Sequence, residues 1–414
     1  MENQPIQQGK KTVLMLGCFD TKAEDFNYLH SCLSQLGVQI LSMNTGIFAS
    51  NTNFHIDLPA ATVAQEANTS IDELKAKNDR GHVVEKMGKG AARLISQLLA
   101  RDKIQAAIGM GGGGGTYIAL AAMQAIPIGI PKLCLSTVAI KDLSRQVGAK
   151  DITLMPSIVD VAGLNKISKV LISQAAGAIS GMLNAPLGEH QEAKGTIAVS
   201  MFGNTTACVE ECTRLLKAKG YDVLAFHAVG IGGKTMESLI REGFFDGVLD
   251  LTTTELADDL CDGICSAGPD RLTAATELGI PQVIAPGCLD MVNYGHLDTV
   301  PKRFQSRQLY SWAPDVTLMR TDEEENRTLG RSLAQKVNKT SGKAAMLIPL
   351  KGISIVSSEG GVFHSPATDE VLFNTIRSEL RADIPLVEME VDINDKTFAL
   401  KAVNLLLNML GETP

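Results

Sequence analysis

The chain has 414 residues, more than one hydrophobic core usually holds, so we expect two domains. With 45% hydrophobic and 20% charged residues it has the composition of a soluble globular protein, and its net charge of −8 argues against a nucleic-acid-binding or anionic-membrane-binding surface. The most apolar stretch, residues 118–140, is interrupted by Pro127, Pro131 and Lys132, so we expect no membrane span, and the polar start "MENQPIQQGKK" predicts no signal peptide.

The first predicted unit, from Thr12 to Gly46, consists of an apolar strand, a turn, an amphipathic helix and a second strand. Its turn reads "GCFDTK", and Asp20 or Thr21 could simply cap the helix that begins near Ala23. Lys22 fits that role less well, because a cation in the first turn opposes the helix dipole; an anion above it would explain the lysine. Residues 46–82 are predicted to form a long functional loop with a short helix in "TSIDELKA".

A run of five glycines lies in "GMGGGGGT", between an apolar strand and the predicted helix "YIALAAM". Close packing of the helix on the sheet would need only one or two glycines, so the run indicates a ligand that approaches the main chain. The helix N-terminus favours an anion there. No acidic residue ends a following strand about twenty positions on, so phosphate binding is favoured over binding of a nicotinamide dinucleotide.

The second half of the chain repeats this plan. Thr196 to Gly230 matches the unit from Thr12 to Gly46, and residues 247–290 echo residues 106–139. We therefore predict an α/β fold with two Rossmann-like open parallel-sheet domains related by an internal duplication. The boundary is predicted in "NAPLGEHQEAKG", Asn184 to Gly195, which places an N-terminal domain at residues 1–186 and a C-terminal domain at 195–414.

A phosphate-binding alternative lies in the second half, in "AVGIGGKT", Ala228 to Thr235. It matches the P-loop pattern except for its first glycine, and Asp250 at the end of "GVLD" could help to hold magnesium. The short helix that follows and the missing glycine count against it.

Three side chains of the second half form a candidate catalytic set: His227, Glu255 and Asp290. Each lies at or just beyond a predicted strand end, where open α/β sheets hold ligands, and His227 could act as acid or base on a small polar substrate beside Thr252 to Thr254. Structural roles stay open for all three: a satisfied histidine, a helix-capping glutamate and a turn aspartate.

Eight ordered blocks, among them "LGCFDTKAED", "GMGGGGGT", "FHAVGIGGKTME" and "PGCLDMVNYG", extend over nearly the whole chain. In these blocks the sequence resembles the Tm-1-like ATP-binding family, also called UPF0261. The resemblance implies two Rossmann-like domains with ATP as the cofactor in the first; whether Mg²⁺ accompanies it stays open. The implied ATP-binding residues are Asp20, Thr21, Lys22, Thr45, Arg80, Gly81, Gly111, Gly112, Gly113, Gly114, Gly115 and Thr116.

Two departures bear on these implied roles. A plant member of the family has serine where this chain has Gly113, so we expect a hydroxyl contact to phosphate to be absent here while the backbone contacts remain. The family also accepts arginine and alanine in place of Lys234 and Thr235, which counts against a working P-loop.

Two functions remain open on the sequence. One is a nucleotide-dependent enzyme that acts on a small polar metabolite; the other is an ATP-binding regulatory or interaction protein without catalysis of its own. We predict no metal bound by the protein alone and no nucleic-acid or membrane partner. The eight cysteines form no C-x-x-C pair, which predicts reduced thiols and a cytoplasmic location, and apolar helix faces on two sheets predict a homodimer.

Overall fold

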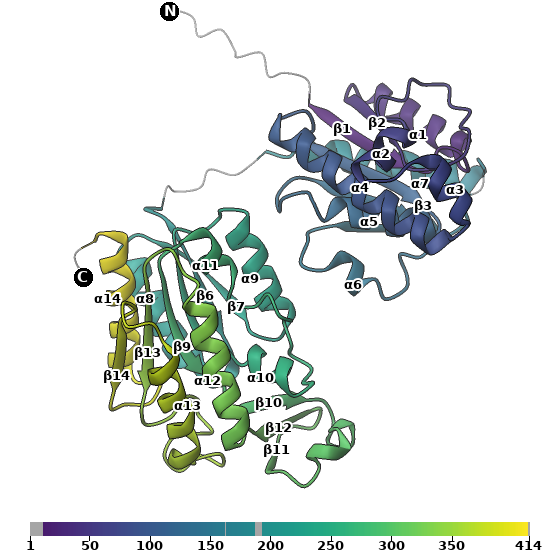
Figure 1. Ribbon diagram of the computed structural model, residues 1–414. Coiled ribbons are helices and arrows are strands. Elements are labelled where there is room, and N and C mark those ends of the chain that lie inside the picture. Colours follow the sequence, from purple (N-terminus) through teal and green to yellow (C-terminus); the bar gives the residue numbers. More distant parts are fainter. Residues whose placement is uncertain (1–10, 162, 187–192, 413–414) are drawn as a thin grey trace, which may run out of the picture. The chain divides into compact units, whose positions relative to one another are not determined.

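The computed structural model describes residues 11–161, 163–186 and 193–412 (Figure 1). The chain divides into two compact units, Met1–Glu189 and His190–Pro414. Part of the predicted boundary segment, residues 187–192, lies outside the described residues. Both units are α/β with a parallel sheet, so the predicted fold class is confirmed.

The first unit is built on a five-stranded parallel sheet of order β2-β1-β3-β4-β5. Its chain builds outward from β1 in two directions, so β1 and β3 flank the switch point at which doubly wound sheets bind ligands. The strands are β1 (Thr12–Gly17), β2 (Gln39–Asn44), β3 (Ala106–Gly111), β4 (Lys132–Ser136) and β5 (Thr153–Pro156).

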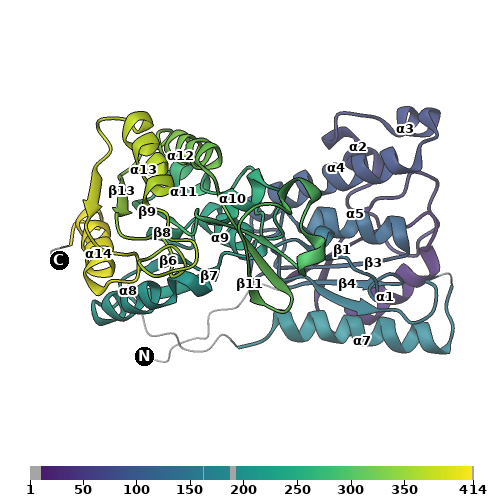
Figure 2. The same cartoon turned by 90° about the horizontal axis from the view of Figure 1, so that it is seen from below.

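Helices cover both faces of this sheet, as Figure 2 shows for α7 on one side and α4 and α5 on the other. Alternate residues of β1 face opposite cores: Val13 and Met15 pack with α1 and α7, while Leu14 and Leu16 pack with α2 to α5. The helices are α1 (Ala23–Gln35), α2 (Ala60–Glu66), α3 (Ile71–Lys77), α4 (Arg80–Ala100), α5 (Gly113–Met123), α6 (Ser144–Val147) and α7 (Lys166–Leu183).

The second unit has a six-stranded parallel sheet of order β14-β13-β9-β8-β6-β7. Read from β7, this is the strand order of the first unit with one strand added, as the predicted duplication requires. The strands are β6 (Thr196–Met201), β7 (Asp222–His227), β8 (Gly247–Thr252), β9 (Gln282–Gly287), β13 (Ala344–Pro349) and β14 (Leu386–Met389).

Two cores lie on the two faces of this second sheet. One packs against α8 and α14, and the other against α10, α12 and α13 (Figure 2). The helices are η1 (Gly203–Thr205), α8 (Thr206–Ala218), α9 (Ile231–Arg241), α10 (Glu255–Leu260), α11 (Ala274–Leu278), η2 (Leu297–Thr299), η3 (Lys302–Phe304), α12 (Glu323–Val337), α13 (Pro366–Glu379) and α14 (Lys396–Leu410).

The second unit also has a three-stranded antiparallel sheet, of order β10-β12-β11, that the sequence analysis did not predict. It comprises β10 (Met291–Tyr294), β11 (Leu309–Ala313) and β12 (Val316–Arg320). Within the described ranges, none of the helices of either unit combines the length and hydropathy that a membrane span requires.

Candidate functional site

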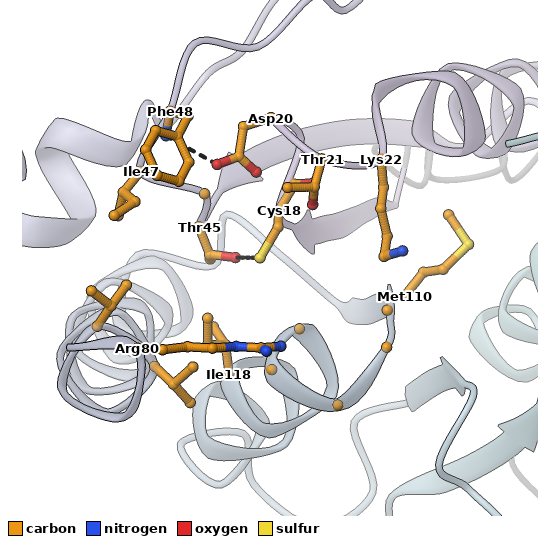
Figure 3. Close-up of a pocket in the computed structure, with 18 of the residues that line it drawn as sticks. Cys18, Asp20, Thr21, Lys22, Thr45, Ile47, Phe48, Arg80, Met110 and Ile118 are labelled. Carbon is orange, nitrogen blue, oxygen red and sulfur yellow. Dashed lines mark hydrogen bonds between the residues drawn. The ribbon is translucent and has the colours of Figure 1, made fainter. Parts of the chain in front are cut away.

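A cavity of about 1000 Å³ opens in the first unit where the loops after β1, β2, β3, β4 and β5 come together (Figure 3). This is the carboxyl edge of the sheet at the switch point between β1 and β3. Ten of the twelve residues proposed for ATP line it: Asp20, Thr21, Lys22, Thr45, Arg80, Gly111, Gly112, Gly113, Gly114 and Gly115.

The glycine loop presents bare backbone to this cavity. Gly112 is the N-cap of α5. A Cβ on Gly111 would lie 3.0 Å from the Cα of Gly115, so the tight turn itself needs that glycine. A Cβ on Gly112 would meet only the Thr137 hydroxyl, at 3.7 Å, and one on Gly113 would have no neighbour within 4 Å. Packing within the protein therefore does not explain why residues 112 and 113 are glycine.

Two cations lie beside this loop. Arg80, the first residue of α4, reaches toward it, and a Cβ on Gly114 would lie 3.4 Å from the Arg80 Nη2 (Figure 3). Lys22 is the N-cap of α1, and its Nζ donates a hydrogen bond to the Val161 carbonyl. With the amide groups at the start of α5, these side chains give one side of the cavity a positive character.

Asp20 has a structural contact within the site. Its Oδ2 accepts a hydrogen bond from the Phe48 amide at 3.0 Å, which ties the loop after β2 to the loop after β1. Its Oδ1 has no hydrogen-bond partner among the described residues. Cys18 also lines the cavity; its Sγ lies 3.6 Å from the Thr45 hydroxyl, and burial raises the pKa of its thiol.

Two of the predicted residues, Gly81 and Thr116, are not part of the cavity wall. Gly81 lies in the first turn of α4, next to Arg80. Thr116 is fully buried, and its hydroxyl lies 2.6 Å from that of Ser136, so it joins α5 to β4 beneath the glycine loop. Thr116 therefore positions the glycine loop and does not line the cavity.

The apolar part of the cavity was not predicted from the sequence. It comes from the loop after β2 and from α3, α4 and α5. Of these elements, the loop after β2 and α3 lie in the predicted long loop, and α3 is the short helix predicted in "TSIDELKA". A capping box at Ser70 and Glu73 fixes the start of α3. The apolar residues in this part are Ile47, Phe48, Leu74, Val83, Val84 and Ile118.

In the second unit the three candidate catalytic residues have different environments. His227 is exposed at the end of β7, with its ring centroid 5.4 Å from that of Phe202. Glu255 and Asp290 are both 0% exposed, so neither carboxylate reaches a surface cleft. A shared catalytic role stays a prediction, and the burial of both carboxylates counts against it.

The carboxylate of Asp290 lies in a separate buried network. Its Oδ2 accepts a hydrogen bond from the Ser354 hydroxyl at 2.8 Å, and burial raises its pKa to about 6. The neighbouring threonines are also engaged: Thr252 bonds the Thr205 hydroxyl at 2.7 Å, and Thr253 donates to the Ala285 carbonyl. These hydroxyls hold the carboxyl edge of the second sheet together.

Glu255 occupies the anion position of the P-loop-like segment. Its Oε1 accepts hydrogen bonds from the amides of Gly230, at 2.7 Å, and Gly233, at 3.1 Å, at the start of α9. Its Oε2 accepts from Arg271 Nε at 2.5 Å, and Arg271 also forms a bidentate pair with Asp250. The amides that would hold a phosphate are thus bonded internally, and the structure argues against the P-loop alternative.

Comparison with known proteins gives matches along nearly the whole chain. Two family models match: "Uncharacterised protein family (UPF0261) N-terminal domain" over residues 11–187, and the C-terminal domain of the same family over residues 194–410. A UPF0261 protein of Clostridium tetani is 42% identical over 97% of this chain and 99% of its own length. The tomato ToMV resistance protein Tm-1(GCR237) is 33% identical over 97% of this chain and 56% of its own length.

Solved structures give only a weak likeness. A crystal structure of UDP-N-acetylglucosamine 2-epimerase covers 98% of this chain and 99% of that one, with 10% identity and a TM-score of 0.21. At that TM-score the likeness carries no argument about function.

Proposed function

Starting from the premise that this chain belongs to the UPF0261 family, we propose that the cavity of its first unit binds a nucleoside triphosphate, with ATP as the expected ligand. The observation that carries the proposal is the pair Gly112 and Gly113. Neither has a positive φ, and neither has a packed neighbour that a Cβ would displace, yet both leave backbone bare toward the cavity. A phosphate against the start of α5 gives that bare backbone a purpose.

The surroundings of the loop support a polyphosphate. Lys22 and Arg80 both line the cavity beside the glycines and supply two positive charges. Helix α5 has 11 residues, enough for its N-terminal amides to favour an anion. The volume of about 1000 Å³ lies at the upper end of the range for small-molecule sites, so a nucleotide fits.

Magnesium would have suitable partners in this site. Mg²⁺ is usually bound by one or two carboxylates together with substrate phosphates. Asp160 lines the cavity, and Asp20 has an Oδ1 without a hydrogen-bond partner among the described residues. Mg²⁺ would be held by one of these carboxylates together with the phosphates, whose charge it would neutralise.

We propose that the first unit binds ATP, and we propose no reaction for this chain. An enzyme acting on a small polar metabolite would need a second group of accessible side chains, and the buried carboxylates of Glu255 and Asp290 do not offer one. An ATP-binding regulatory or interaction protein requires only the cavity of the first unit, so it is the reading that we favour.

Isothermal calorimetry of the full chain with ATP tests the proposal. Lys22→Ala should weaken ATP binding by about 1–3 kcal/mol, the range for losing a charge-assisted hydrogen bond. Lys103→Ala is the matched control, because Lys103 is exposed outside the cavity and should have no effect. An intact protein that binds no ATP at millimolar concentration would rule the proposal out; equal affinity in the Lys22 variant would remove Lys22 from the site.

A further inference from the structure

We infer that the end of the cavity next to β2 receives the base of the nucleotide, and that Phe48 is the residue on which the base stacks. The inference rests on the proposed function, because it concerns the same cavity. It adds an assignment of the two ends of the site: one for phosphate, one for an aromatic base.

The two ends differ in chemistry. The glycine loop and Lys22 mark the phosphate side at β1 and β3. In Figure 3, Ile47 and Phe48 lie on the other side of the view from Lys22 and Met110. Two apolar side chains of the Phe48 side, Ile47 and Phe48 itself, come from the loop after β2. The remaining apolar lining comes from the helices: Leu74, Val83, Val84 and Ile118. A base needs such apolar surface, and a triphosphate does not.

The rest of the first unit leaves Phe48 largely uncovered. Its side chain is 62% exposed, although it belongs to the cavity wall. An exposed ring leaves apolar area in water, which a stacked base would cover. Lys75 is its one described cationic neighbour, with Nζ 5.6 Å from the ring centroid.

The position of Phe48 is set by the backbone of its loop. The Phe48 amide donates to Asp20 Oδ2 at 3.0 Å. Gly46 makes this close approach possible, because a Cβ there would lie 2.1 Å from Asp20 Oδ1. The backbone that carries the ring is therefore fixed beside the cavity before a ligand arrives, which reduces the entropy cost of binding.

The opposite end of the cavity is a poorer place for a base. It is lined by Ile158, Val159 and Asp160, which include no aromatic ring. Ile158 has a φ of 62°, a strained conformation for a β-branched residue, and its side chain is 75% exposed. A carboxylate and two aliphatic side chains offer no stacking surface.

The test compares two ligands, ATP and inorganic triphosphate, by calorimetry on the full chain. Phe48→Ala should weaken ATP binding about 5- to 150-fold, the effect of losing one base–aromatic stack, and leave triphosphate binding unchanged. Phe48→Trp should retain ATP affinity. Lys22→Ala should weaken both ligands, and Tyr117→Ala should weaken neither, because Tyr117 is an exposed aromatic residue of α5 outside the cavity wall.

Three results would overturn the assignment of Phe48. They are an unchanged ATP affinity in Phe48→Ala, an equal loss for ATP and triphosphate, and a failure of Phe48→Trp to retain ATP binding. Circular dichroism of each variant checks that the fold is kept, as expected for a side chain this exposed. If the unmodified chain binds neither ligand, the proposed function itself fails, and the base assignment fails with it.

Discussion

Alanine at Gly112 should have different effects on stability and on ATP binding. Alanine at Gly112 meets only the Thr137 hydroxyl, so Gly112→Ala should keep the free energy of unfolding within about 1 kcal/mol. The new methyl group would stand against a phosphate, so ATP affinity should fall by about 1 kcal/mol or more. Gly177→Ala is the matched control, because Gly177 is an exposed residue of α7 outside the cavity wall and an added Cβ there has no neighbour within 4 Å; it should retain binding. Denaturant unfolding and calorimetry measure the two effects; a Gly112 variant with unchanged affinity would separate the loop from the ligand.

Asp290 predicts a pH effect on the stability of the second unit. Its carboxyl is fully buried, and burial raises its pKa to about 6; Arg320 opposes the shift and Asp369 adds to it. The stability that the protonated group contributes is fully present below about pH 3.8 and is lost as the pH rises through about 6. Asp290→Asn cannot ionise and keeps an acceptor for Ser354.

The stability of the unmodified chain relative to Asp290→Asn should therefore be lowest at neutral pH. The free energy of unfolding of the unmodified chain, minus that of Asp290→Asn, should fall by on the order of 3 kcal/mol between about pH 4 and 6 and then stay level. Urea unfolding over that range measures it. A difference that does not change with pH would mean that Asp290 ionises normally in the folded chain.

At the scale of elements, the start of α9 depends on Glu255. Removing that carboxylate leaves two amides of α9 and one side of Arg271 without their partner in a fully buried site. The charges of Asp250, Glu255 and Glu237 hold the pKa of Arg271 above its ordinary value against the effect of burial, so its charge would remain. Glu255→Ala should cost about 3–5 kcal/mol of stability.

Chemical denaturation checks that cost, with the exposed Glu210→Ala as control, for which we expect little change. ATP affinity should be the same in both variants, because neither side chain lines the cavity. Tighter ATP binding after removal of Glu255 would instead show that the emptied α9 terminus accepts phosphate and would restore the P-loop alternative.

The sequence predicted those elements whose signals are local. The glycine loop and Lys22 were found because bare backbone and a misplaced charge can be recognised within a few residues. The apolar lining was missed, because Val83 and Val84 look like ordinary core residues of a helix until the fold brings them into one cavity wall with Phe48. The ion pair of Glu255 was not predicted for a related reason: its partner Arg271 lies 16 residues away, and no spacing rule predicts that pair.

At the scale of the whole molecule, each unit has the interior of an independent domain. Every described hydrophobic cluster draws its residues from one unit: two clusters flank the sheet of the first unit, and three belong to the second. The family models divide the chain in the same region, after residue 187 and before residue 194. The homodimer stays a prediction.

Because the cores are separate, the two units should fold when they are expressed apart. A fragment of residues 1–189 keeps the whole cavity wall, from Cys18 to Asp160, and should bind ATP with the affinity of the full chain. The fragment of residues 190–414 should unfold cooperatively and bind no ATP, because Glu255 fills its one P-loop-like terminus. Thermal unfolding followed by circular dichroism tests folding, and calorimetry tests binding. A folded first fragment without ATP affinity, beside a second fragment that binds ATP, would move the nucleotide site to the second unit.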